Sequence, residues 1–141
     1  MWGIIAARIS GALMSIQGVW NTEVTKQSSV WVASGWVQAT ALIACIMMWF
    51  FTGREAVNLI WQVRPLYVLL GGIVGAFITF TVIQSMGALG PAKACLLIVV
   101  SQIIVAYGVE LFGLFGVDKV GFEWKKMIGA VVAIIGIIIF H

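Results

Sequence analysis

The sequence has few of the residues from which soluble domains build their surfaces, disulfides and metal sites. Only 9% of its 141 residues are charged, whereas soluble domains carry about 25%. The chain has one histidine, His141, and two cysteines, Cys45 and Cys95, both of which lie inside apolar runs. So few ligand-forming residues exclude a disulfide framework and leave no set of metal ligands. We therefore expect no soluble domain, no metal and no cofactor.

The charged residues that are present are scattered along the chain. The longest run of adjacent basic residues is Lys125-Lys126, and no basic segment alternates with exposed aromatics, so nucleic acid is not an expected partner. The sequence also lacks a histidine cluster, a paired-carboxylate motif and a serine in a nucleophile context. These gaps, together with connections too short for a catalytic domain, argue against an enzyme.

Long apolar runs dominate what remains. Apolar residues make up 62% of the chain, and its mean hydropathy is +1.13. A membrane-spanning helix needs about 20 apolar residues, and polar breaks divide the chain into five segments of about that length. We predict an all-α integral membrane protein with a single transmembrane domain over residues 1–141. Its five transmembrane helices are expected at residues 2–21, 30–51, 66–86, 92–112 and 122–140.

The first apolar run is expected to remain as a helix, because Arg8 interrupts it and no clear signal-peptide cleavage site follows. With five crossings, six basic residues fall on the side of the N-terminus and two, Lys26 and Lys93, on the other. The six are Arg8, Arg54, Arg64, Lys119, Lys125 and Lys126. Because basic residues favour the cytoplasmic side, we predict a multi-pass protein of the cell membrane with a cytoplasmic N-terminus and an external C-terminus.

Polar and small residues follow two faces of the first segment. One face carries Arg8, Gly11, Ser15, Gly18 and Thr22, and the neighbouring face carries Ser10, Met14, Gln17 and Asn21. Small residues let helices approach closely, which explains the glycines by packing alone. Polar groups at this depth usually face a bundle interior or a cavity. Arg8, Gln17 and Asn21 are therefore candidates for contact with a substrate, with packing as the competing interpretation.

The fourth segment threads polar residues through an apolar helix. Gln102, Ala106 and Glu110 share one face, with Ser101 beside it and Tyr107 within a turn of Glu110. Gln102 lies near the middle of the span, where its amide needs a partner, whereas Glu110 lies near the end and can reach water as an unpaired interfacial acid. Gln102, Glu110, Tyr107 and Ser101 are candidates for binding substrate or for coupling its movement to another ion.

Small residues in two other segments suggest contacts between helices or subunits. Gly71 and Gly75 form a GxxxG pair in the third segment, and Gly129, Ala133 and Gly136 line one face of the last. The last segment is short and otherwise uniformly apolar. Its small-residue face suits contact with a second subunit, and exposure to lipid is the competing interpretation.

Three stretches resemble a known family of membrane proteins. They are "GALMSIQGVWNTEV" near the start, "GGIVGAF" in the third segment and, above all, "SQIIVAYGVELFGLFG" at residues 101–116. Together with the span order, they resemble the YdcZ-type five-helix family of the drug/metabolite transporter (DMT) superfamily. Gln102 and the turn at residues 113–116 match the pattern of that family. Ser101 stands where glycine is expected, and Glu110 stands where aspartate is expected.

The resemblance implies that the chain is half of a DMT-like ten-helix inverted-repeat transporter. Two halves in opposite orientation give the inverted repeat that alternating access uses. The expected partners are therefore the lipid bilayer, a small-molecule substrate, and either a second copy in an antiparallel homodimer or an oppositely oriented paralogue in a heterodimer.

Two functions fit the sequence. The first is secondary transport or export of small metabolites or drug-like molecules by a dimer. In the most specific version of this hypothesis, Glu110 takes up and releases the protons that drive transport. The alternative is a non-transporting membrane subunit that scaffolds or regulates a partner, which an unpaired interfacial acid and small-residue faces would also suit.

Overall fold

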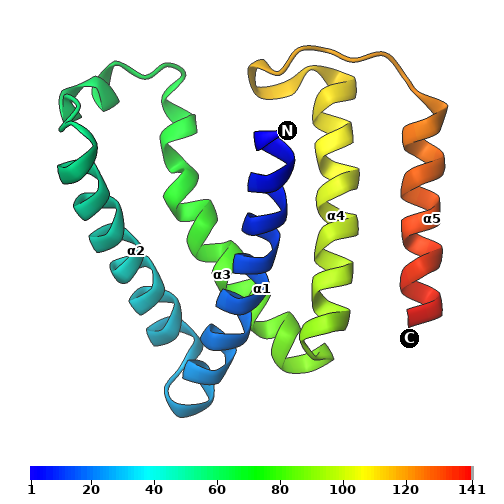
Figure 1. Ribbon diagram of the computed structural model, residues 1–141, viewed down its shortest axis with the longest axis horizontal. Helices are drawn as coiled ribbons and strands as arrows, with labels where there is room; N and C mark the ends of the chain where they lie inside the picture. The colour runs from blue at the N-terminus through cyan, green and yellow to red at the C-terminus, as the bar shows by residue number, and fades with distance from the viewer. Residues whose placement is uncertain (141) are drawn as a thin grey trace. The chain divides into compact units, whose positions relative to one another are not determined.

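The computed structural model describes residues 1–140, all of whose regular structure is helical. His141, the only histidine, lies outside the described residues. Five α-helices follow one another along the chain, and short 3-10 helices (η) lie in the connections (Figure 1). The elements are α1 (Trp2–Gln27), α2 (Val30–Thr52), η1 (Val57–Gln62), η2 (Leu66–Leu70), α3 (Gly71–Leu89), α4 (Pro91–Phe112), η3 (Leu114–Gly116) and α5 (Trp124–Phe140).

Helix α1 continues past its predicted end at Asn21 through a polar stretch that looks like a connection. The hydroxyl groups of this stretch have their hydrogen-bond partners inside the helix. The Oγ1 atoms of Thr22 and Thr25 donate to the carbonyls one turn back, at 2.8 Å each, so these side chains do not compete with the helix. Lys26 also pairs with Glu23 at 2.8 Å. Helix α2 then begins at the N-cap Ser29, whose Oγ accepts a hydrogen bond from the Val32 amide.

Within residues 1–140, four segments are long and apolar enough to cross a membrane. They are α1, α2, α4 and the continuous segment Leu66–Leu89, whose first turn is the 3-10 helix η2. Helix α5 has 17 residues, which at about 1.5 Å per residue gives ~26 Å, whereas the apolar core of a bilayer is about 30 Å thick. The fifth crossing therefore stays a prediction.

The chain divides into two compact units, Met1–Ala88 and the part that begins at Leu89. In the first unit, the packed core lies where the end of α1, the start of α2 and the end of α3 meet. Gly18 packs under Met86, because a Cβ there would lie 2.5 Å from Met86 Cε. Trp31 of α2 stacks on Phe80 of α3, with ring centroids 4.8 Å apart. In the second unit, α4 and α5 lie side by side (Figure 1).

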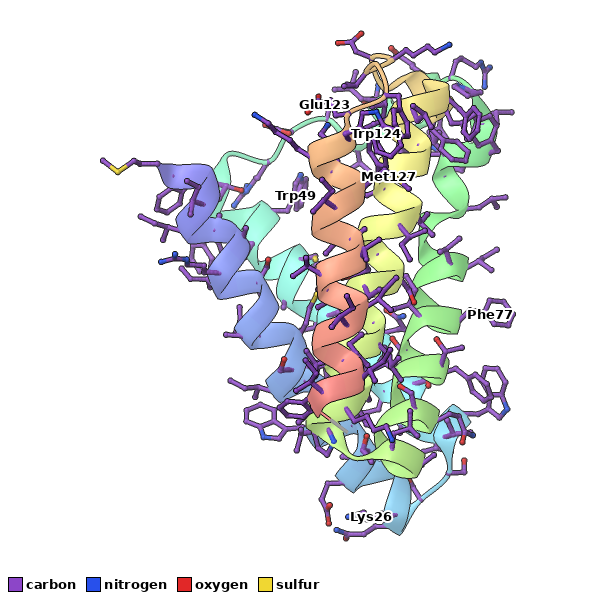
Figure 2. The ribbon with its side chains drawn as sticks, turned by 90° about the vertical axis from the view of Figure 1, so that its right-hand side faces the viewer. Lys26, Trp49, Phe77, Glu123, Trp124 and Met127 are labelled. Atoms are coloured by element: carbon purple, nitrogen blue, oxygen red, sulfur yellow. The ribbon has the colours of Figure 1, made fainter. Side chains whose placement is uncertain are left out.

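Few side chains are buried within the chain itself. Among residues 1–140, the buried ones apart from Gly18 are Asn21, Ala33, Ser34, Ile83, Met86 and Ala94. Large apolar side chains such as Phe77, which Figure 2 shows pointing away from α3, remain exposed. Such a surface is expected of helices covered by lipid or by further helices, because exposing so much apolar surface to water is unfavourable.

Candidate functional site

An ion pair joins the end of α4 to the start of α5. Lys126 Nζ lies 3.0 Å from Glu110 Oε2 and 3.6 Å from Glu123 Oε1. The prediction that Glu110 is an unpaired acid is therefore wrong. Both side chains of the shorter pair are partly exposed, at 38% for Lys126 and 42% for Glu110, so each remains accessible to solvent or to a ligand.

Tyr107 adds a second tie between the two helices. Its hydroxyl oxygen accepts a hydrogen bond from the Glu123 amide at 2.9 Å, and its ring centroid lies 5.4 Å from Lys126 Nζ. Glu123 immediately precedes α5, and its carbonyl accepts hydrogen bonds from the amides of Lys126 and Met127 in the first turn of that helix. Figure 2 shows Glu123, Trp124 and Met127 gathered at this end of α5. Tyr107 and Glu110, one turn apart on α4, thus hold the first turn of α5.

The connection between α4 and α5 folds back on the helix that it leaves. Helix α4 ends at Gly113, whose left-handed backbone has a φ of +65° and whose N–H donates to the Val109 carbonyl. A Cβ at Gly113 would lie 3.2 Å from Lys119 Cβ, so a larger residue would be both strained and crowded. Beyond the turn, the Val120 amide donates to the Glu110 carbonyl at 2.9 Å. The helix exit predicted at residues 113–116 is present.

A groove of about 720 Å³ runs between α4 and α5 from this cluster. Its polar lining residues are Tyr107, Glu110 and Lys126, and the others are apolar or small. Those residues are Ile103, Ile104, Ala106, Met127, Gly129, Ala130, Val131 and Ile134. Small-molecule sites commonly have volumes of about 300–1,000 Å³ and combine apolar walls with a few polar groups. The groove therefore has the size and chemistry to hold an amphipathic molecule.

The structure brings together some of the predicted site residues and separates others. Tyr107 and Glu110 line the groove, whereas Ser101 and Gln102 are exposed and lie beyond its last lining residue on α4, Ile103. Within residues 1–140, the Gln102 amide makes no hydrogen bond, so the mid-span partner that it needs is not supplied by the described part of the chain.

The polar candidates of α1 belong to the first compact unit. Gln17 and Asn21 line a separate cavity of about 390 Å³ between α1 and α2. Arg8 is exposed and has no ion pair with any residue from 1 to 140. Four of the seven candidates thus fall into two pairs, one on α1 beside α2 and one on α4 beside α5, whereas Arg8, Ser101 and Gln102 line neither cavity.

The small residues predicted for packing differ in their surroundings. A Cβ at Gly75 would lie 3.6 Å from Gln38 Nε2 of α2, whereas Gly71, Gly129 and Gly136 have open space within 4 Å. Ala133 is half-buried on α5. The role of Gly129, Ala133 and Gly136 in contacts between subunits stays a prediction.

Lys126 and Glu123 are the site residues that the sequence pattern did not single out. Lys126 lies 16 residues from Glu110, beyond the three- or four-residue spacings that reveal neighbours on one helix. A usable signal exists nonetheless. When a short connection joins antiparallel helices, an acid in the last turn of one helix and a base in the first turn of the next lie at the same membrane face.

A match with a known protein family covers nearly the whole chain. Residues 2–139 match the family described as "Putative inner membrane exporter, YdcZ". The chain belongs to the YdcZ family. The resemblance to the YdcZ family is thus confirmed, and the description of that family names an exporter of the inner membrane. No curated protein and no solved structure matches the chain.

Proposed function

We propose that this YdcZ-family chain exports small metabolites or drug-like molecules across the inner membrane, as a dimer that works by alternating access and is driven by protons. The observation that carries the proposal is the α4–α5 groove, which combines apolar walls with an accessible ion pair at one end. Apolar walls suit the body of a cargo molecule, and a carboxylate suits both a polar group on the cargo and a proton.

The ion pair supplies a route by which a proton acts on the groove. When Glu110 is ionised, it holds Lys126 and with it the first turn of α5. A proton on Glu110 removes the charge that attracts Lys126, so the start of α5 is then held to α4 mainly by Tyr107. Proton uptake and opening of the groove are thereby coupled through one bistable contact.

Assembly with a second subunit accounts for the sparse burial within the chain. The helices leave most of their large apolar side chains exposed, and only part of that surface needs to face lipid. Five crossings would make the chain half of a DMT-like ten-helix inverted repeat, completed by an oppositely oriented copy or paralogue. Gly129, Ala133 and Gly136 offer a small-residue face on α5 for that contact.

Transport in liposomes tests the role of Glu110. The purified protein is placed in vesicles with an imposed proton gradient, and the movement of ethidium, benzoate and uridine is followed as cationic, anionic and neutral probes. We expect gradient-dependent movement of at least one probe, and its loss in Glu110→Gln without loss of the dimer. Glu123→Gln is the matched control, because it removes the other carboxylate near Lys126 but lies outside the groove lining.

Two results would count against the proposal in different ways. Unchanged gradient-driven transport in Glu110→Gln would remove Glu110 from proton coupling. Failure of the native protein to move any of the three probes would contradict export of these chemical classes.

Labelling of single cysteines from both sides of the membrane tests orientation and assembly. In a protein in which Cys45 and Cys95 are replaced, cysteines are placed at residues 58 and 118 and in the α1–α2 turn at residue 28. A cytoplasmic N-terminus places residues 58 and 118 inside and residue 28 outside. A single uniform orientation without an oppositely inserted partner would overturn the inverted dimer.

A further inference from the structure

A second cavity, between α1 and α2, has a chemistry unlike that of the α4–α5 groove. It has a volume of about 390 Å³, and its polar and aromatic lining residues are Gln17, Trp20, Asn21, Trp36 and Thr40. The rest of its lining is aliphatic, and none of its lining residues is ionisable. The cavity therefore pairs hydrogen-bonding groups with aromatic surface and has no fixed charge.

Asn21 is the residue that points to a ligand. The residue is only 8% exposed, it lines the cavity, and its amide makes no hydrogen bond among residues 1–140. An amide that faces a cavity without a partner is unfavourable where lipid replaces water. The hydrogen bond that Asn21 makes with Thr25 uses its backbone carbonyl and leaves its side-chain amide free of any role in the helix.

The neighbouring groups extend the same chemistry. Gln17, one turn earlier on the same face of α1, also has an amide free of hydrogen bonds within the described chain. Across the cavity, Thr40 Oγ1 donates to the carbonyls of Trp36 and Val37 at 3.0 Å each, so its lone pairs remain to accept. Two amides and a hydroxyl acceptor thus face the same space from two helices.

Trp20 and Trp36 supply flat apolar surface, one from each helix. Glu23, two residues after Asn21, shares an adjoining cavity with Trp20 and is paired with Lys26 at 2.8 Å. A cationic or anionic molecule in the α1–α2 cavity would therefore find no opposite charge in its lining. An uncharged ring-shaped molecule would stack on indole and use both donors and acceptors.

We propose that the α1–α2 cavity binds an uncharged, ring-containing molecule with hydrogen-bonding groups on its edge, through Asn21 and Gln17. Nucleosides and sugars share this chemistry, since both combine a ring face with hydroxyl or amide groups. The proposal rests on the proposed function in one respect, namely that the bound molecule is cargo. Binding itself is independent of transport.

Equilibrium binding to the full-length protein in lipid nanodiscs tests the site. The probes are labelled uridine, labelled methyl β-glucoside, ethidium and benzoate. We expect uridine or the glucoside to bind and Asn21→Leu to raise the dissociation constant by about tenfold or more, because the amide hydrogen bonds are lost. Any binding of ethidium or benzoate should not change in this variant. Asn58→Leu, which alters an exposed amide on η1 outside the cavity, is the matched control.

Thermal unfolding separates a binding role from a structural one. If the role of Asn21 is to bind a ligand, leucine at this position leaves the unfolding midpoint unchanged or raises it, because an unpaired amide is removed. A lower midpoint, together with unchanged binding in the milder Gln17→Leu variant, would overturn the proposal. So would binding of both neutral probes that is unaffected by Asn21→Leu, or a loss of ethidium binding equal to that of uridine.

The outcomes also separate this proposal from export. Gradient-driven transport that survives while neither neutral probe binds the cavity contradicts the binding site alone. Binding that depends on Asn21, in a protein that moves none of the probes, contradicts export and leaves the binding site in place.

Discussion

The two compact units hold their helices together by different kinds of contact. In the unit Met1–Ala88, apolar and small groups make the contacts, with Gly18 under Met86 and Trp31 stacked on Phe80. Between α4 and α5, polar groups make the contacts: Lys126 forms an ion pair with Glu110, and the Glu123 amide donates a hydrogen bond to the Tyr107 hydroxyl. Packing of the first kind has no charge to titrate, whereas the second kind responds to protons and ions. The difference marks the α4–α5 pair as the part of the chain best suited to switching.

Of the variants considered, reversal of the charge at Glu110 is expected to have the largest effect on the contact between α4 and α5. Glu110→Lys places two cations together where an ion pair lies at 3.0 Å, so the start of α5 should leave α4. Spin labels on the exposed residues Val105 and Val132 should show a longer and broader distance distribution, and the unfolding midpoint should fall.

Two further variants test whether the ion pair itself, and not the overall charge, sets this distance. The double variant Glu110→Lys/Lys126→Glu should recover most of the native distance, with the shortfall due to Glu123. Lys125→Glu, which changes the adjacent lysine, should leave the distance unchanged. An equal response to Lys125→Glu would mean that overall charge matters and the ion pair does not.

The packed end of the first unit should be sensitive to volume. Gly18→Leu forces a side chain into space that Met86 and Val82 occupy, and overpacking of this kind costs about 1–3 kcal/mol. Gly11→Leu is the control on the same helix, because Gly11 has open space within 4 Å. Thermal unfolding of both variants in one detergent measures the difference, and equal midpoints would show that the contact with α3 does not contribute to stability.

Tyr107→Phe should produce the smallest effect. It removes the hydroxyl that accepts the Glu123 N–H at 2.9 Å but keeps the ring near Lys126. A hydrogen bond of this type contributes about 1 kcal/mol. Hydrogen exchange should therefore quicken at the start of α5 and stay unchanged in α1. Tyr67→Phe alters the other tyrosine of the chain, and faster exchange at Glu123 in that variant would argue against a specific tie.

The helices themselves could be predicted from the apolar runs, but their ends followed local hydrogen bonding. Helix α1 continues to Gln27, and its threonine hydroxyls bond within the helix, an outcome that polarity alone does not indicate. The third span begins with a 3-10 turn before Gly71. The turn at Gly113 was predictable, because glycine is the residue that best tolerates the left-handed end of a helix.

The site could be predicted only in part. Spacing along α4 placed Tyr107 and Glu110 near one another, because both lie within one helical turn. Spacing could not pair Glu110 with Lys126, since that contact depends on how the connection returns α5 to α4. Gln102 shares a face with Glu110, yet the groove begins at Ile103, because the extent of a groove depends on the neighbouring helix as well as on periodicity.

The hydrogen bond from the Val120 amide to the Glu110 carbonyl has a practical consequence for protein engineering. It closes residues 111–119 into a short loop, so inserted residues there would enlarge a loop that is tied to Glu110, a lining residue of the groove. The stretch around η1, at residues 56–62, is exposed, belongs to the other compact unit and contributes no lining residue to the groove. An epitope tag or a reporter fusion for topology mapping therefore belongs between α2 and α3, where it leaves the loop at residues 111–119 unchanged.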